Sequence, residues 1–344
     1  MRKVAYYCLS IITAVLLWLY HQDFAPLVGL AVKAQVVGMR YQDTADEGVF
    51  KLLFCGTGSP TRTVDRGQPC LALVANQKLF LFDAGEGTLG KLHQYKAPVG
   101  KLTHIFLTHL HSDHFSGVAE VLHSSWLYGR MHNVRLIGPP GTQQLIDGIA
   151  ASNAADIAER MHVLAPDGVS ADNALAEVQE ETIADDGLYT VFEEQGLLIQ
   201  AFRVTHPDWP FAYGCKITHQ KKVIVISGDT TISAGVEHHA KDADVLIHEA
   251  TNTALMHLIA DELDANSSVI SSARIKRIVN VHSDTLALAE LAQKINVKHL
   301  LLNHLISALP TSFVTDRYFT SGMDENFDGE ISVAFDGWWF YPNK

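Results

Sequence analysis

Cysteine is scarce in this chain of 344 residues. The sequence has four cysteines and no C-x-x-C pair, which excludes a zinc ribbon and argues against a dense disulfide framework. Cys8 lies in an apolar run and Cys55 ends an expected strand. We therefore expect buried free thiols rather than a disulfide bridge.

Basic residues are also in short supply. Lys and Arg total 26 against 38 Asp and Glu, so the formal net charge is −12. Such a surface repels polyanions on average, and charge alone does not favour nucleic acid as a partner. With 47% apolar and 19% charged residues, the chain can bury one large core or two smaller ones. The 18 histidines favour a metal-binding protein.

Long hydrophobic runs are absent except at the N-terminus. Arg2 and Lys3 precede an uncharged run from Val4 to Tyr20, which predicts a signal peptide or a membrane anchor. We favour an uncleaved anchor over residues 1–21, followed by a linker over 22–48 and a hydrolase domain over 49–344. The basic residues before the run predict an extracytoplasmic domain, periplasmic or secreted and held at the membrane.

From residue 49 onward, apolar runs of strand length alternate with helical patterns, which predicts an α/β layered domain. The expected strands fall into two sets, 50–55, 70–75, 79–82, 102–108 and 134–137, then 197–204, 223–227, 245–248 and 298–303. An acidic interval separates the two sets. It has nine carboxylates and no Lys or Arg from Met161 to Phe202, and we interpret it as a solvated face or as a lid that repels polyanions.

Metal-ligating residues gather at the end of one expected strand. Residues 103–108 run directly into His109-Leu110-His111-Ser112-Asp113-His114. Positions two apart in extended backbone point the same way, so His109 and His111 can bind one ion together. Asp113 and His114 come after the turn and can face a second ion. A catalytic zinc needs three protein ligands, so further ligands must come from elsewhere in the chain.

This motif, with Phe82-Asp83-Ala84-Gly85-Glu86-Gly87-Thr88 upstream, resembles the metallo-β-lactamase superfamily, in its ribonuclease Z and arylsulfatase-like branch. Seven further elements match in order, namely 53–60, Gly138-Pro139-Pro140-Gly141, Val204-Thr205-His206-Pro207, Ser227-Gly228-Asp229-Thr230, His248-Glu249-Ala250-Thr251, His282-Ser283-Asp284-Thr285 and Asn303-His304-Leu305. The resemblance and the two strand sets together predict a four-layer αββα sandwich.

The resemblance implies a complete set of metal ligands and helpers. His109, His111 and His206 bind a first zinc ion, Asp113, His114 and His304 a second, and Asp229 bridges them. Manganese or iron in place of zinc stays open. Asp83 fixes a ligand histidine, and Glu249 orients His282, which protonates the leaving group.

We expect a hydrolase in which two metal ions activate a water for attack on a small anionic ester, an aryl sulfate or a phosphodiester. The acidic interval lies where a ribonuclease Z carries its basic tRNA-binding arm, and the stretch after His304 reads Leu305-Ile306-Ser307-Ala308, which is more typical of arylsulfatase-like members. A tRNA 3′-endonuclease and a non-catalytic zinc-binding module are the alternatives; a β-lactamase fits the motifs less well. We expect contact with a membrane at the N-terminus and do not expect nucleic acid as a partner. The sequence leaves open whether the protein forms a homodimer.

Overall fold

The computed structural model describes residues 25–42, 48–61, 63–207, 209–266, 272–306 and 312–343. Two compact units, 1–44 and 45–344, make up the chain. The expected anchor over residues 1–21 lies outside the described residues. Within them, no helix combines the length and the apolar character needed to cross a membrane. Residues expected as a linker instead form helix α2, Ala25–Gln42, with Pro26 in the first turn, where its missing N–H costs no hydrogen bond.

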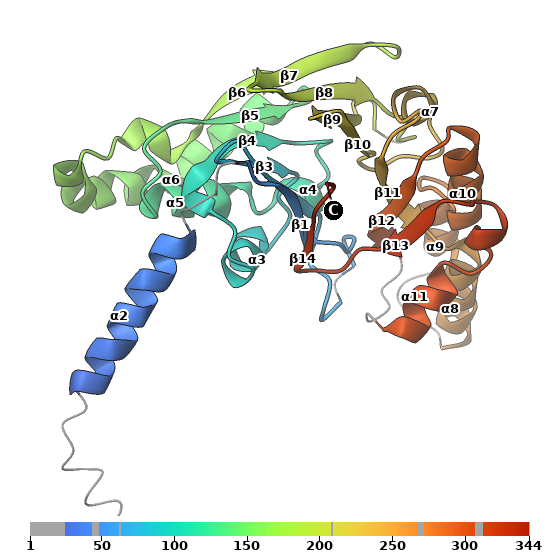
Figure 1. Cartoon of the computed structure of the whole chain (residues 1–344), viewed down its shortest axis with the longest axis horizontal. Coiled ribbons are helices and arrows are strands. Elements are labelled where there is room, and N and C mark those ends of the chain that lie inside the picture. Colours follow the sequence, from blue (N-terminus) through green and yellow to red (C-terminus); the bar gives the residue numbers. More distant parts are fainter. Residues whose placement is uncertain are drawn as a thin grey trace, which may run out of the picture. The chain divides into compact units, whose positions relative to one another are not determined.

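Residues 45–344 are built around two mixed sheets that face each other (Figure 1). Over the described residues each sheet has seven strands. The first has the order β14-β1-β2-β3-β4-β5-β6, with β1 Phe50–Gly56, β2 Cys70–Ala75, β3 Lys78–Phe82, β4 Leu102–Phe106, β5 Val134–Gly138, β6 Ala176–Glu180 and β14 Trp338–Phe340. The second has the order β13-β12-β11-β10-β9-β8-β7, with β7 Leu188–Glu194, β8 Leu197–Arg203, β9 Tyr213–His219, β10 Lys222–Ile226, β11 Val245–Thr251, β12 His299–Ile306 and β13 Glu330–Val333.

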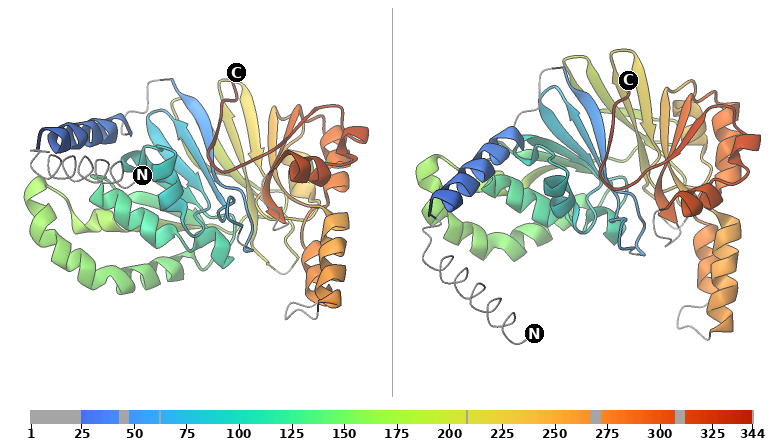
Figure 2. Two further views of the ribbon diagram at one scale, coloured as in Figure 1. Left: turned by 90° about the horizontal axis from the view of Figure 1, so that it is seen from below. Right: turned by 60° about the horizontal axis from the view of Figure 1, so that its bottom comes forward.

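Helices cover the outer face of each sheet, which Figure 2 shows from two further sides. The first sheet carries α3 Thr88–Gln94, α5 Val118–Leu127 and α6 Thr142–Leu164, and the second carries α7 Ala234–His239, α10 Thr285–Lys294 and α11 Phe313–Phe319. Helices α8 Thr253–Ala265 and α9 Ser272–Val279 pack against each other as a pair that projects past the second sheet. A short helix α4, Ser112–Phe115, follows β4, and 3-10 turns η1 to η4 occupy Val99–Lys101, Ala165–Asp167, Ala171–Ala174 and Met323–Glu325. The predicted α/β sandwich is confirmed in this arrangement.

Burial explains why the central strands are uninterrupted apolar runs. All six residues of β2 and all seven of β11 are buried, because each sheet is covered on one face by helices and on the other by the opposite sheet. Phe80, Phe106 and Ile217 belong to the core between the sheets, whereas Leu81 and Ile105 pack beneath the helices of the first sheet. Alternate residues of one strand thus serve two different cores.

A disulfide joins Cys55 and Cys70, with their Cα atoms 5.0 Å apart. The expectation of free thiols is therefore wrong for these two cysteines and right for Cys215, which is free and buried; Cys8 lies outside the described residues. The antiparallel pairing of β1 with β2 brings Gly56 opposite Cys70, with an irregularity at Cys55. Spacing along the chain does not reveal such a cross-strand pairing.

The last described strands complete both sheets. β13 extends the second sheet parallel to β12, and β14 crosses to the first sheet and pairs antiparallel with β1. Asp336, between the two strands, accepts hydrogen bonds from the backbone of Thr57 and Gly67 and forms an ion pair with Lys91. Neither strand was expected from the sequence, because both are short and only half-buried.

The disulfide gives a prediction for stability. The bridge closes a loop of 15 residues, for which the loss of unfolded-state entropy amounts to about 3 kcal/mol. Cys55→Ala together with Cys70→Ala should lower the free energy of unfolding by about that amount in denaturant titrations. Dithiothreitol should destabilise the wild type similarly and leave the double variant unchanged. Equal stability of the two proteins under oxidising conditions would contradict the prediction.

Candidate active site

The His109–His114 motif lies at the carboxyl end of β4. His111 has extended backbone and precedes helix α4, whose single turn carries Asp113 and His114 on the buried side. The turn after β3 packs directly under this helix, since a Cβ added to Gly85 would lie 2.3 Å from the carbonyl oxygen of Asp113. Glycine is therefore required there for the motif to sit against the sheet.

Seven side chains form three overlapping groups of metal-ligating atoms. Within each group the ligand atoms lie within 4.8 Å of one another. The groups are His109, His111 and His206; His109, His114 and Asp229; and Asp113, His114 and His304. The first and third groups are the two ligand sets expected from the sequence, and the second contains Asp229 with one histidine from each side.

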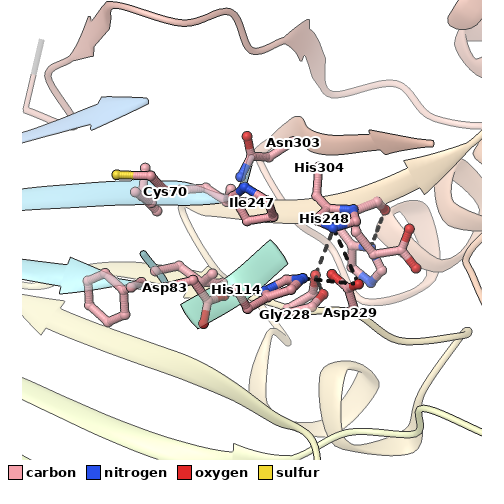
Figure 3. Close-up of a pocket in the computed structure, with 15 residues that line it drawn as sticks. Cys70, Asp83, His114, Gly228, Asp229, Ile247, His248, Asn303 and His304 are labelled. Carbon is pink, nitrogen blue, oxygen red and sulfur yellow. Dashed lines mark hydrogen bonds and ion pairs between the residues drawn. The ribbon is translucent and has the colours of Figure 1, made fainter. Parts of the chain in front are cut away.

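Asp229 lies at the centre of this arrangement. Its Oδ2 atom is 3.3 Å from Nε2 of His114, 3.3 Å from Nε2 of His304 and 3.9 Å from Nε2 of His109. Figure 3 shows His114, from helix α4, and His304, from strand β12, directed at this carboxylate. A single carboxylate in contact with imidazoles of both ligand sets is suited to bridging two cations.

Two strands of the second sheet deliver ligands through irregular backbone. Gly228, directly after β10, has φ +63°, and a Cβ there would lie 2.6 Å from the carbonyl oxygen of Tyr213. In β12, Asn303 pairs with Glu249 and Leu305 with Ala250, so His304 is the extra residue of a β-bulge, with φ +44°. The bulge turns the imidazole out of the regular alternation and toward Asp229.

Several buried polar atoms of the site have no hydrogen-bond partner among the residues that the structure describes. They include Asp113 Oδ2, Asp229 Oδ1, His114 Nε2 and His304 Nε2. Leaving such atoms unpaired costs about 1–3 kcal/mol each, and metal coordination relieves that cost. The donor set of imidazoles and carboxylates suits divalent cations such as zinc, so the residues present fit a metal centre.

Burial favours the neutral form of the three imidazoles of the first ligand set. It lowers the pKa of His206 to about 4 and that of His109 well below the ordinary value, and it also lowers the pKa of His111. Burial alone would raise the pKa of Asp229, but the neighbouring His304 and His114 hold it well below its usual range. Neutral imidazoles beside an ionised carboxylate are the protonation states that metal binding requires.

Asp83 orients a ligand rather than taking part in a reaction directly. Its Oδ2 atom accepts a hydrogen bond from Nδ1 of His114 at 2.8 Å and one from the Thr108 hydroxyl at 2.9 Å, while Oδ1 accepts from the Thr108 backbone N–H. Burial would lower the pKa of His114, but the Asp229 and Asp83 carboxylates raise it well above its ordinary value. Because Nδ1 is bonded to Asp83, Nε2 is the nitrogen that faces the metal site and would lose its proton when a metal binds.

Glu249 and His282 lie together at the edge of the ligand cluster. Glu249 Oε1 is 3.4 Å from Nδ1 of His282 and accepts a hydrogen bond from the backbone of Ser283. The His282 ring lies 6.0 Å from the rings of both His206 and His304. Burial lowers the pKa of His282, but the Glu249 carboxylate outweighs burial, so the pKa of His282 is raised above its ordinary value.

Two residues in this region were missed by the sequence interpretation. The Thr108 hydroxyl lies 3.1 Å from Nδ1 of His109 as well as contacting Asp83, and it directly precedes the motif. The ring of Trp209 lies 4.8 Å from that of His111. Trp209 follows His206 by three residues, but a lone tryptophan in a loop carries no signal that distinguishes a site residue from a packed one.

Comparisons with known proteins identify the class. The chain is 26% identical to the ribonuclease Z of Mycobacterium bovis over 295 residues, which covers 84% of this chain and 96% of that protein. It is 27% identical to the ribonuclease Z of Mycobacterium marinum over 268 residues, 76% and 88% of the two chains. The short form of human tRNase Z superimposes with a TM-score of 0.58 at 24% identity, over 84% of this chain and 98% of that one. The metallo-β-lactamase fold protein YhfI of Bacillus subtilis gives the same score at 17% identity, over 85% and 98% of the two chains.

Fold and site thus define a member of the metallo-β-lactamase superfamily, in its ribonuclease Z branch. Within it, residues 50–305 match the model of the family described as anti-Pycsar protein Apyc1, and the chain belongs to that family.

Two expectations need correction. The relatives act on RNA, as the name ribonuclease Z states, and they support a metal-dependent hydrolase of phosphoester bonds rather than an arylsulfatase. The expected extracytoplasmic, membrane-anchored location is also wrong, because it disagrees with the same relatives, which are ribonucleases Z.

Asp229 provides a test of the metal centre. Asp229→Ala removes the carboxylate shared by both ligand sets and should cost at least one metal ion per chain, measured by elemental analysis of zinc-equilibrated protein. Asp264→Ala, on the exposed side of α8, is the control and should keep the wild-type metal content. Wild-type metal content in Asp229→Ala would count against a bridging role.

His282 provides a test of leaving-group protonation. His282→Ala should lower kcat about a hundredfold for an ester with an alcohol leaving group and less than about tenfold for p-nitrophenol, which departs without a proton. Because the pKa of His282 is raised, the wild-type rate with the alcohol ester should fall as the pH rises through that pKa, and the variant should lack this decline. An equal loss with both leaving groups would assign His282 a structural role instead.

Proposed function

We propose that this protein is a dinuclear metal-dependent phosphodiesterase that hydrolyses nucleotide phosphodiesters. The observation that carries the proposal is the convergence of His109, His114 and His304 on the Asp229 carboxylate, with the Glu249–His282 pair beside it. Three overlapping ligand groups would hold two ions about a shared carboxylate. A purely structural zinc site is normally closed by four ligands and has no need of such a carboxylate or of an adjacent acid.

Divalent cations bound there supply Lewis acidity and neutralise the charge of an anionic ester. The protein's own residues orient the metal ligands and supply the proton for the leaving group. Asp83 and Thr108 hold His114 in one tautomer, so the geometry of the ligand cluster is fixed before a substrate binds. Glu249 orients His282 through Nδ1, which leaves Nε2 of His282 to donate a proton to the departing oxygen.

The choice of a phosphodiester over a sulfate ester rests on the relatives. The curated proteins that match 84% and 76% of the chain are ribonucleases, whose reaction cleaves a phosphodiester bond between nucleotides. RNA cleavage of the ribonuclease Z type is therefore the first candidate activity, and it replaces the aryl sulfate in our expectation.

A second candidate, a small nucleotide diester, is favoured by the interval between β5 and His206. These residues form α6, η2, η3, the edge strands β6 and β7, and β8, which pairs with β7 (Figure 1). Its two arginines are both engaged in ion pairs, Arg160 with Asp156 and Arg203 with Asp185. Phosphate contacts to a long RNA are ordinarily made by Lys and Arg, and this interval offers only these two arginines among its many carboxylates.

One substrate panel tests the proposal. Zinc-loaded protein is given thymidine 5′-p-nitrophenyl phosphate, a pre-tRNA and p-nitrophenyl sulfate under the same conditions, with Asp229→Ala as the inactive control. We expect hydrolysis of the thymidine diester and none of the sulfate. The ratio of pre-tRNA to diester cleavage, and its decline with salt, decides between the two candidates. Sulfate hydrolysis without diester hydrolysis would overturn the proposal.

A further inference from the structure

Trp209 lies against the exposed side of the first ligand set. Its ring is 4.8 Å from that of His111 and 6.2 Å from that of His109, at interplanar angles of 63° and 74°. His111 is half-buried whereas His109 is fully buried, so the indole lies toward the more accessible of the two imidazoles. Trp209 is itself half-buried and therefore presents part of its surface outside the protein core.

The backbone that carries Trp209 is tied to the sheet on both sides. The backbone N–H of Trp209 donates a hydrogen bond to the backbone carbonyl of His206 at 2.9 Å, and the two residues form an isolated β-bridge. The guanidinium of Arg203 donates to the carbonyl of Pro210 at 2.7 Å, and the Val204 N–H to the carbonyl of Ala212 at 2.9 Å. These bonds fix the backbone of Trp209 relative to the ligand His206. The loop that carries the indole therefore loses little conformational entropy when a substrate binds.

We propose that Trp209 is a specificity-determining residue, the aromatic wall on which the nucleobase of the substrate stacks. This inference rests on the proposed function and identifies which part of the diester the protein recognises beside the metal centre. A phosphate held at the ligand cluster has its ester arms within reach of the cluster's immediate neighbours, and Trp209 is such a neighbour. Stacking on an indole is favourable for any base, because every base has a π-face.

The position of His282 indicates which arm meets Trp209. The leaving oxygen must lie at His282, whose ring neighbours are those of His206 and His304. Trp209 instead contacts His111 and His109. The indole therefore contacts the nucleoside that stays on the phosphorus, and the departing group is recognised elsewhere.

Two diesters with the same leaving group isolate this contact. Thymidine 5′-p-nitrophenyl phosphate carries a base on the arm that stays, and methyl p-nitrophenyl phosphate carries none. In Trp209→Ala, kcat/KM for the thymidine ester should fall roughly tenfold, mainly through KM, while that for the methyl ester changes less than about twofold. Trp209→Phe keeps an aromatic face and should stay within about threefold of wild type for both.

The controls separate recognition from support of the metal site. Metal content is measured in every variant, and Trp339→Ala, which alters a half-buried tryptophan of β14, should leave the ratio of the two esters unchanged. Equal losses with both esters, or loss of metal in Trp209→Ala, would show that the indole only supports His111 and would overturn the inference.

The affinity of thymidine 5′-phosphate, measured by calorimetry on the zinc-loaded proteins, separates this inference from the proposed function. If the wild type hydrolyses neither diester, the proposed function fails. Weaker binding of the nucleotide by Trp209→Ala than by wild type would then still support the aromatic wall, and equal binding would contradict it.

Discussion

The carboxylate of Asp229 is fully enclosed at the point where both groups of imidazoles meet. A buried negative charge is costly unless cations or hydrogen-bond donors compensate it. Here the compensating groups come from α4, from the end of β4 and from β12, so neither sheet alone can satisfy the carboxylate. The charge of this one carboxylate is therefore balanced only where the two sheets are packed together, with the bulge of β12 and the loop after β10 in place.

Regular sheet geometry brings these elements close, and local irregularity completes the site. β10, β11 and β12 run parallel, so their carboxyl ends meet at one edge and carry Asp229, Glu249 and His304. In a regular strand the side chain at position 304 would follow the alternation of its neighbours. The bulge in β12 and the left-handed glycine before Asp229 place these two side chains in the same cluster.

The sequence predicted the parts of this protein that depend on burial and on local spacing. Strands such as β2 and β11 were predicted from apolar runs, because both of their faces are covered. The histidine motif was predicted from its high density of metal-ligating residues. Edge strands β6 and β7 were missed because they are polar and half-exposed, and the Cys55–Cys70 bridge because it depends on strand register. Trp209 was missed because its position relative to His111 is set by a tight turn, which leaves no periodicity.

The crossing of the C-terminal strands has a consequence for how the protein is made. The side chain of Asp336 binds the backbone of Thr57 across 279 residues of sequence, and β14 covers an edge of β1 that is otherwise open. At roughly 5–20 residues per second, a ribosome needs some tens of seconds to supply that strand after β1 has been synthesised. Throughout that time the nascent first sheet has an unpaired edge, a surface that can pair with other chains. Crowding of ribosomes on one message would therefore favour aggregation through β1, and a chaperone that shields this edge would be most useful before translation ends.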